Sequence, residues 1–165
     1  MVSRPVQRPV DAVHAIAALA GDDDEDTALL LEMKREATDH LTQQVWCQRI
    51  TEIYWGDGIG GVVAVFLFMF DAVPGDGALA APAWCVVGDL PALLLPCAGR
   101  RDTPVDALER YCGEMERWGA SVRSGGCGAG CAPVAATPTL EHAEMLEGRV
   151  QLLREDVIPQ LRLAR

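Results

Sequence analysis

The sequence has no basic patch. Of its 165 residues, 14 are Lys or Arg and 24 are Asp or Glu, so the formal net charge is −10. The densest basic spot is Arg100-Arg101, and Asp102 follows it directly. Because such a surface repels a phosphate backbone, we expect no nucleic-acid partner. A basic protein would instead be attracted, although solubility alone also accounts for the acidity.

No apolar run is long enough for a membrane helix. The longest, 59–70, has 12 residues, whereas a membrane helix needs about 20. The stretch 10–20 resembles the apolar part of a secretion signal, but Asp11 and His14 interrupt it. We therefore expect no membrane partner, a short amphipathic helix over 10–20 and a cytoplasmic location.

A catalytic motif is also missing. The three histidines, His14, His40 and His142, fall on predicted helices, and none is near a Gly-x-Ser-x-Gly turn or a cysteine nucleophile. The glycine-rich segment 56–61 precedes a predicted strand, whereas a dinucleotide-binding loop follows one. The sequence therefore predicts surface histidines, no cofactor and no catalytic residues.

The six cysteines do not form a clear metal site. Cys85 and Cys112 fall on apolar faces, where a reduced thiol packs as a small apolar side chain. Cys127 and Cys131, with His142, are weak candidates for three zinc ligands, and the two thiols are candidates for a reversible disulfide. The surrounding glycines favour a flexible loop over 124–133.

The stretch 58–91 is the most informative part of the chain. Its β-branched and aromatic residues predict strands at 61–70 and 83–88, joined by a long connection, and a third strand at 92–97. Pro91 is expected to break the strand pairing because it has no N–H. The segment 46–55 is compatible with helix or strand, and the glycines at 56–58 are expected to end it.

Three long helices are predicted around these strands. The first covers 24–45, with a buried stripe of Leu30, Met33, Ala37, Leu41 and Val45. The second begins at Thr103-Pro104 and ends near Arg123, and the third begins at Thr137-Pro138 and ends or kinks at Pro159. The expectation is an α+β fold: a small antiparallel sheet of three or more strands, three long helices and the short N-terminal helix. A flexible tail over 1–9 precedes one domain over 10–163.

An acidic run and two further aspartates are the candidate binding residues. The run, Asp22, Asp23, Asp24, Glu25 and Asp26, is either a partner surface or the cap of the following helix, and we favour the cap. Asp89 follows a buried strand and is expected to shape a turn. Paired with Asp57, it is alternatively an acid–base pair or a cation site.

Aromatic residues gather just ahead of the strands and inside them. Trp46, Tyr54, Trp55 and Trp84 are expected in the core, although Trp and Tyr also anchor protein interfaces. We take Trp55, beside Asp57, as a further candidate for partner binding.

The pattern resembles an uncharacterised bacterial domain family. The residues that carry the resemblance are Trp84-Cys-Val-Val-Gly-Asp-Leu-Pro91, Thr103-Pro-Val-Asp-Ala-Leu108 and Trp118. It covers roughly 55–158, and an aromatic residue that follows Gly-Asp-Leu-Pro in similar sequences is replaced here by Leu93-Leu-Leu95. The resemblance implies a fold and no established activity.

Three functions remain open at this stage. The leading hypothesis is a non-catalytic acidic binding protein of the immunity, antitoxin or adaptor type that binds a basic protein. The alternatives are a small enzyme that uses Asp57 and Asp89, and a structural module that forms a homodimer. Small size, acidity, clustered aromatics and the missing catalytic motif favour the first.

Overall fold

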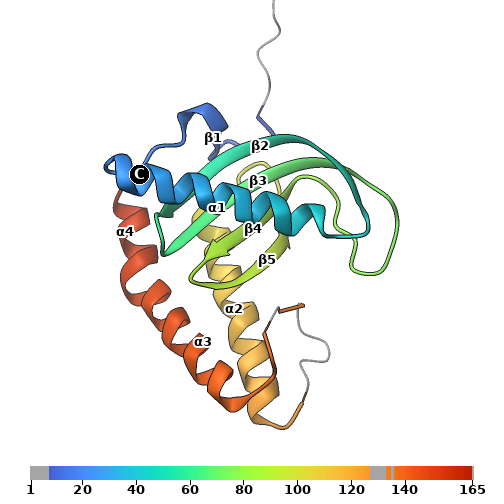
Figure 1. Cartoon of the computed structure of the whole chain (residues 1–165), viewed down its shortest axis with the longest axis vertical. Helices are drawn as coiled ribbons and strands as arrows, with labels where there is room; N and C mark the ends of the chain where they lie inside the picture. The colour runs from blue at the N-terminus through green and yellow to red at the C-terminus, as the bar shows by residue number, and fades with distance from the viewer. Residues whose placement is uncertain (1–7, 127–132, 135, 165) are drawn as a thin grey trace, which may run out of the picture.

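A five-stranded antiparallel sheet forms the centre of the molecule (Figure 1). The computed structural model describes residues 8–126, 133–134 and 136–164. The strand order in the sheet, β1-β2-β3-β4-β5, is also the order along the chain. One helix layer covers each face of the sheet, so the predicted α+β class is confirmed.

The middle strand, β3 (Val63–Ala72), is buried on both faces. Successive side chains of a strand point to opposite faces. Accordingly, Val63, Val65 and Leu67 belong to one hydrophobic cluster, and Ala64, Phe66 and Phe68 belong to the other. Two covered faces explain why this stretch reads as one continuous apolar run.

The strand before it, β2 (Cys47–Ile59), resolves the open assignment of 46–55. The prediction that the glycines at 56–58 end this element is wrong, because β2 pairs with β3 as far as Ile59. A side chain at Gly56 would place its Cβ only 2.5 Å from the carbonyl oxygen of Val65. Glycine here therefore permits close strand packing rather than a turn.

The remaining strands are β4 (Ala83–Gly88) and β5 (Leu90–Pro96). Gly88 adopts a φ of 149°, which side chains rarely tolerate, and the chain reverses at Asp89. The strand β5 continues through Pro91, but the expected disruption of pairing is present locally, because the register with β4 shifts here and Pro91 has no pairing partner in β4. β5 is the outer strand, and an outer strand tolerates proline because one side of its backbone needs no partner strand.

One helix, α1 (Asp24–Thr42), packs on the sheet face that carries Phe66 and Phe68. The helix ends three residues earlier than predicted. Val45 lies beyond its end and is 94% exposed, so its assignment to the buried stripe is wrong.

The opposite face is covered by α2 (Pro104–Arg123) and α3 (Leu140–Leu152). Thr103 caps α2, as predicted, and its partner in the capping box is Asp106. The third helix begins two residues later than predicted, because the side chain of Thr139, not Thr137, accepts the N–H of His142. A π-helical turn, η2 (Leu153–Val157), then leads past Pro159 into α4 (Ile158–Leu163).

The predicted N-terminal helix over 10–20 is not formed. Val10 and Val13 are fully buried, and β1 (His14–Ala15) pairs with Tyr54 and Trp55 of β2. A single 3-10 turn, η1 (Ile16–Ala18), follows. Contact with the core and with β2 has overridden the weak helical pattern. Most of the predicted tail and much of the predicted loop, 1–7 and 127–132, lie outside the described residues.

Candidate functional site

The exposed face of α1 carries most of the excess negative charge. Residues 22–42 contain eight Asp or Glu and two Lys or Arg. The sheet-facing stripe, Leu30, Met33, Ala37 and Leu41, is buried. Because α1 is amphipathic, its carboxylates are left facing solvent, and Glu25, Glu32, Glu36 and Asp39 are all exposed.

Part of the acidic run does cap the helix. Asp23 accepts the N–H of Asp26, and Asp26 accepts the N–H of Asp22. Asp26 also accepts the N–H of Gly60 at 2.6 Å, which ties the start of α1 to the β2–β3 turn. Asp24 and Glu25 are exposed in the first turn, where carboxylates favour the helix dipole.

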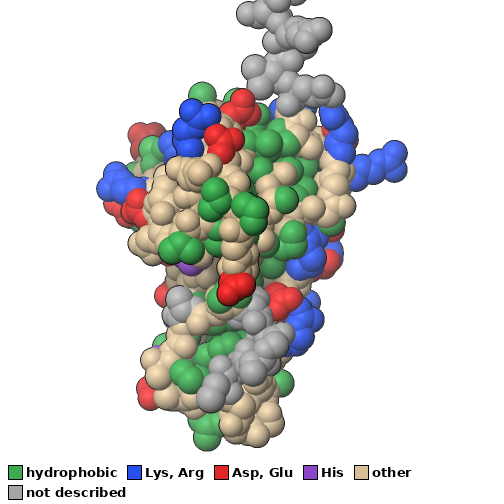
Figure 2. All heavy atoms as spheres, turned by 90° about the vertical axis from the view of Figure 1, so that its right-hand side faces the viewer, with side chains coloured by type: hydrophobic (Ala, Val, Ile, Leu, Met, Phe, Trp, Pro, Cys, Tyr) green, Lys and Arg blue, Asp and Glu red, His purple; other side chains and the backbone are tan. Residues whose placement is uncertain are grey.

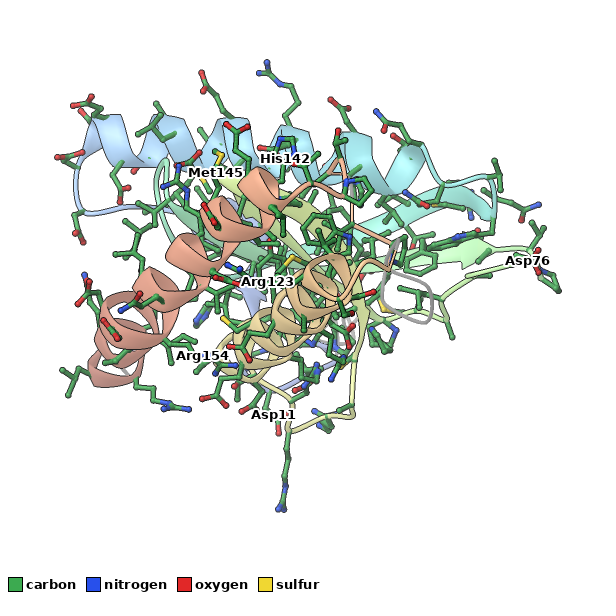
Figure 3. All side chains as sticks on the ribbon, turned by 90° about the horizontal axis from the view of Figure 1, so that it is seen from below. Asp11, Asp76, Arg123, His142, Met145 and Arg154 are labelled. Atoms are coloured by element: carbon green, nitrogen blue, oxygen red, sulfur yellow. The ribbon has the colours of Figure 1, made fainter. Side chains whose placement is uncertain are left out.

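The α1 carboxylates are notable for their number in one short segment, although exposed acids elsewhere in the described structure, such as Asp76, Glu141 and Glu144, also form no salt bridge. Within the described part of the chain, none of the eight forms a salt bridge. On the opposite layer, arginines bridge helices, as in Arg123–Glu147 and Arg154–Glu116 (Figure 3). Negative charge is therefore partly neutralised by arginines on the α2–α3 side, whereas none of the eight carboxylates at 22–39 is paired within the described residues.

A hollow of about 420 Å³ lies between α1 and the outer strand β5. It is lined by Glu32, Arg35, Glu36, Asp39, His40, Gln43 and Ala92. Burial raises the pKa of Glu36 and lowers the pKa of His40. His40 is therefore neutral at pH 7, and three carboxylates outweigh the one guanidinium.

A second hollow, of about 510 Å³, continues along β5 and shares His40 with the first. Its apolar wall includes Trp46, Leu79 and the β5 residues 93–96, and Glu114 adds a carboxylate. Figure 2 views the molecule from this end, where α1 finishes and the β3–β4 connection turns, and apolar side chains gather on this face. Acidic and apolar surfaces thus adjoin at β5.

The predicted pair, Asp57 and Asp89, is not brought together in a pocket. Asp57 lies within β2, opposite Val65, and its side chain accepts the N–H of Gly58 at 2.9 Å. Asp89 lies in the β4–β5 turn, where Arg149 of α3 binds its carboxylate at 2.7 Å. The two hollows that Asp89 lines do not include Asp57. The arrangement does not support acid–base chemistry between them.

Trp55 is a packing residue. Only 7% of it is exposed, and its ring lies 5.4 Å from that of Phe66, centroid to centroid. The structure therefore gives this residue no exposed surface with which to anchor a partner.

Of the three metal candidates, the structure describes only His142. Cys127 and Cys131 lie outside the described residues. His142 lies near the start of α3 (Figure 3), and its Nδ1 is within hydrogen-bond distance of Thr137 O and Thr139 Oγ1. The described residues contain no group of three or more metal-ligating side chains. No described helix has the length and apolar character to cross a membrane.

His142 and Asp89 do meet in a small cleft of about 170 Å³, which sequence reasoning did not foresee. Leu90, Pro91 and Met145 supply an apolar wall, and Arg149 is committed to Asp89. The Asp89–Arg149 ion pair joins the β4–β5 turn to α3, and the two side chains neutralise each other's charge.

Comparison with protein-family models, with curated proteins and with solved structures finds no match. The geometry of the chain's own residues therefore carries the functional argument.

Sequence reasoning also missed Asp102, the one buried charged residue in the described regions. Its carboxylate accepts hydrogen bonds from Trp84 Nε1, the N–H of Ala98 and the guanidinium of Arg110. Burial alone would raise its pKa, but these donors prevail and lower the pKa to about 2. The sequence feature that could have pointed to Asp102 is its position directly before the capping residue Thr103.

Proposed function

We propose that this chain is a non-catalytic binding protein that docks a basic protein on the exposed face of α1. An immunity, antitoxin or adaptor protein has this mode of action. The observation that carries the proposal is the set of α1 carboxylates without ion-pair partners in the described structure. A cationic partner would neutralise them and would be steered toward them at low ionic strength.

No comparable observation favours the other two hypotheses. The enzymatic one required Asp57 and Asp89 in one pocket, and they do not share one. The structural module required a continuous exposed apolar helix face. On α3 the large exposed apolar residues, Leu140, Met145 and Leu152, are spread along the helix among charged side chains.

The first experiment is affinity capture from the native cell extract at low and high salt. The expected result is one basic protein that is retained at about 50 mM salt and lost near 500 mM, because screening weakens exposed charge pairs. The purified partner is then titrated into the chain by calorimetry to obtain stoichiometry and affinity.

Two charge-matched variants locate the contact. The α1 variant carries Glu25→Gln, Glu32→Gln, Glu36→Gln and Asp39→Asn, which spares the capping residues Asp23 and Asp26. The control variant carries Asp76→Asn, Glu141→Gln, Glu144→Gln and Asp156→Asn, four exposed acids elsewhere. We expect the α1 variant to lose at least tenfold in affinity, since rim charges contribute up to about 1 kcal/mol each. Equal losses in the two variants would refute a site on α1.

A further inference from the structure

Within residues 8–126, 133–134 and 136–164, no strand pairs with the outer edge of β5. β4 pairs with β5 on one side, and β5 is the last strand of the sheet (Figure 1). An exposed edge presents N–H and C=O groups that can pair with another extended chain. The sequence of this strand, Leu-Pro-Ala-Leu-Leu-Leu-Pro, contains none of the charged residues that usually protect such an edge.

The register identifies which groups face outward. Pro96 pairs with Ala83 and has no N–H, so this is a pair without mutual hydrogen bonds. Since bonded and non-bonded pairs alternate in an antiparallel ladder, Leu95 and Leu93 bond to β4. The N–H and C=O of Leu94 and the C=O of Ala92 then point away from the sheet, whereas the register shift between Val86 and Gly88 leaves the direction of the Ala92 N–H outside this alternation.

These outward groups have no partner in the described part of the chain. No backbone or side-chain hydrogen bond to the outer side of Ala92 or Leu94 is formed. The flanking carbonyls are already used: Tyr111 donates to Pro91 O, and Arg110 donates to Pro96 O. The open segment is therefore limited to residues 92–95.

The acidic hollow lies beside this segment. The side chains of Ala92 and Leu94 pack with the α1-side cluster, and Ala92 lines the hollow with Glu36 and Asp39. Alternate side chains of an added strand would point to that side of the sheet. Lysine or arginine at those positions would meet the carboxylates of Glu32, Glu36 and Asp39.

We propose that an extended segment of the basic partner pairs with residues 92–95 of β5 as a sixth strand, with its basic side chains toward α1. This inference rests on the proposed function and specifies how the partner is held. Main-chain hydrogen bonds would supply affinity, and the charges on alternate residues would supply specificity.

A second copy of this chain fits the edge less well. Antiparallel pairing of two β5 strands would place both α1 helices on the same face of the joined sheet. Their carboxylates would then adjoin, and like charges brought together at an interface are unfavourable. Charge complementarity therefore selects a basic strand.

The test uses an acetylated and amidated peptide, Lys-Val-Lys-Val-Lys-Val, and its counterpart with Glu in place of Lys. Amide exchange followed by NMR reports each backbone N–H separately. We expect the Lys peptide to slow exchange at Leu94, whereas Leu93 and Leu95 are protected already. The Glu peptide should leave the exchange at Leu94 unchanged.

A matched pair of variants removes the edge donor without moving a charge. Leu94→Pro deletes the outward N–H at a position where an edge strand tolerates proline. Leu94→Ala truncates the same side chain and keeps the N–H. We expect the Lys peptide to bind Leu94→Pro at least fivefold more weakly than Leu94→Ala, the effect of one backbone hydrogen bond. Circular dichroism verifies that both variants retain the fold.

The outcomes are separable. If the Lys peptide binds and the α1 variant weakens it, but Leu94 stays unprotected, this inference fails and the proposed function stands. If Leu94→Pro, still folded, binds as tightly as Leu94→Ala, the inference also fails. Protection that grows with protein concentration, with a dimer mass and no peptide, would assign the edge to a second copy instead.

Discussion

Asp102 joins three parts of the molecule through one carboxylate. It bonds to Trp84 in β4, to the N–H of Ala98 and to Arg110 in α2, and its side chain is 2% exposed. A buried charge is tolerated when its oxygens are fully bonded. Asp102 is therefore a structural centre of the α2 side: it also lines an open hollow of about 710 Å³, but its carboxylate is already occupied by Trp84, Ala98 and Arg110.

Asp102→Asn is expected to lower the free energy of unfolding at pH 7 by about 2 kcal/mol, since Arg110 would lose its paired charge. The pKa of Asp102 is about 2 in the folded chain, below its unfolded value of about 3.9. The stabilisation is therefore complete above about pH 4 and is lost as the pH falls toward 2.

Urea unfolding across that pH range measures this effect, and Asp76→Asn, an exposed loop change, serves as the control. A parent–variant difference that stays constant down to about pH 2 would contradict the assignment of the ionised carboxylate.

Other residues show where sequence reasoning succeeds and where it stops. The acidic run 22–26 and Thr103 were predicted to cap helices because their chemistry is local, and the structure shows Asp23 of that run and Thr103 as the capping residues. Asp102 escaped notice because its partners Trp84 and Arg110 come together only when β4 and α2 pack. Val45 was assigned to the core by periodicity alone, which does not show where a helix ends.

At the scale of elements, the start of α3 shows which of two threonines, Thr137 or Thr139, caps the helix. Thr139 accepts the N–H of His142 and caps the helix, whereas Thr137 lies before it and is exposed. The sequence favoured Thr137 because a proline follows it, but proline does not by itself identify the capping residue.

Thr139→Ala is expected to cost about 1 kcal/mol of stability through loss of the cap. Thr137→Ala should change stability by less than about 0.5 kcal/mol, as an exposed substitution outside the helix. Thermal or urea unfolding of the two variants, measured side by side, decides between them. A larger loss at Thr137 would contradict this helix start.

Longer elements were predicted correctly where the local sequence pattern was strong. The run that forms β3 was found from its apolar content, and α2 was found from its cap and stripe. The strand β2 was ambiguous because its first half, residues 47–53, is largely exposed and carries mixed polarity. The segment 10–20 was misassigned because Val10 and Val13 are held by the core rather than by a local pattern.

At the scale of the whole molecule, charge is distributed unevenly between the two helix layers. Arginines of α2, α3 and α4 offset their acidic neighbours, as in Arg162–Glu109, while the carboxylates of α1 repel one another. Glu36 lies four residues after Glu32 and three before Asp39, and like charges at these spacings destabilise a helix.

We therefore expect Glu32→Gln, Glu36→Gln and Asp39→Asn together, with Glu25 kept because it favours the helix dipole, to make the chain more stable than the parent in low salt, by a few tenths of a kcal/mol for each relieved pair. The advantage should shrink near 500 mM salt, which screens exposed charges. Unfolding curves at two salt concentrations measure both effects. A triple variant that is less stable than the parent would show that these carboxylates serve the fold rather than a partner.

Only one part of the proposed binding surface could be predicted from the sequence. The acidic run was evident, but its relation to β5 depends on α1 crossing the sheet so that Glu36 and Asp39 come beside Ala92. In that crossing, Ala37 and Leu41 of α1 share one hydrophobic cluster with the sheet residue Cys85, whose Sγ lies 4.0 Å from Ala37 O. Contacts between residues so far apart in the sequence cannot be predicted from a local sequence pattern.

The identity of strand order and chain order has a consequence for biosynthesis. Each strand from β2 onward can pair with the one that left the ribosome just before it, so the sheet can grow without waiting for distant segments. The last strand made, β5, is then the growing end of the ribbon, and it stops there with its outer side still able to accept another chain.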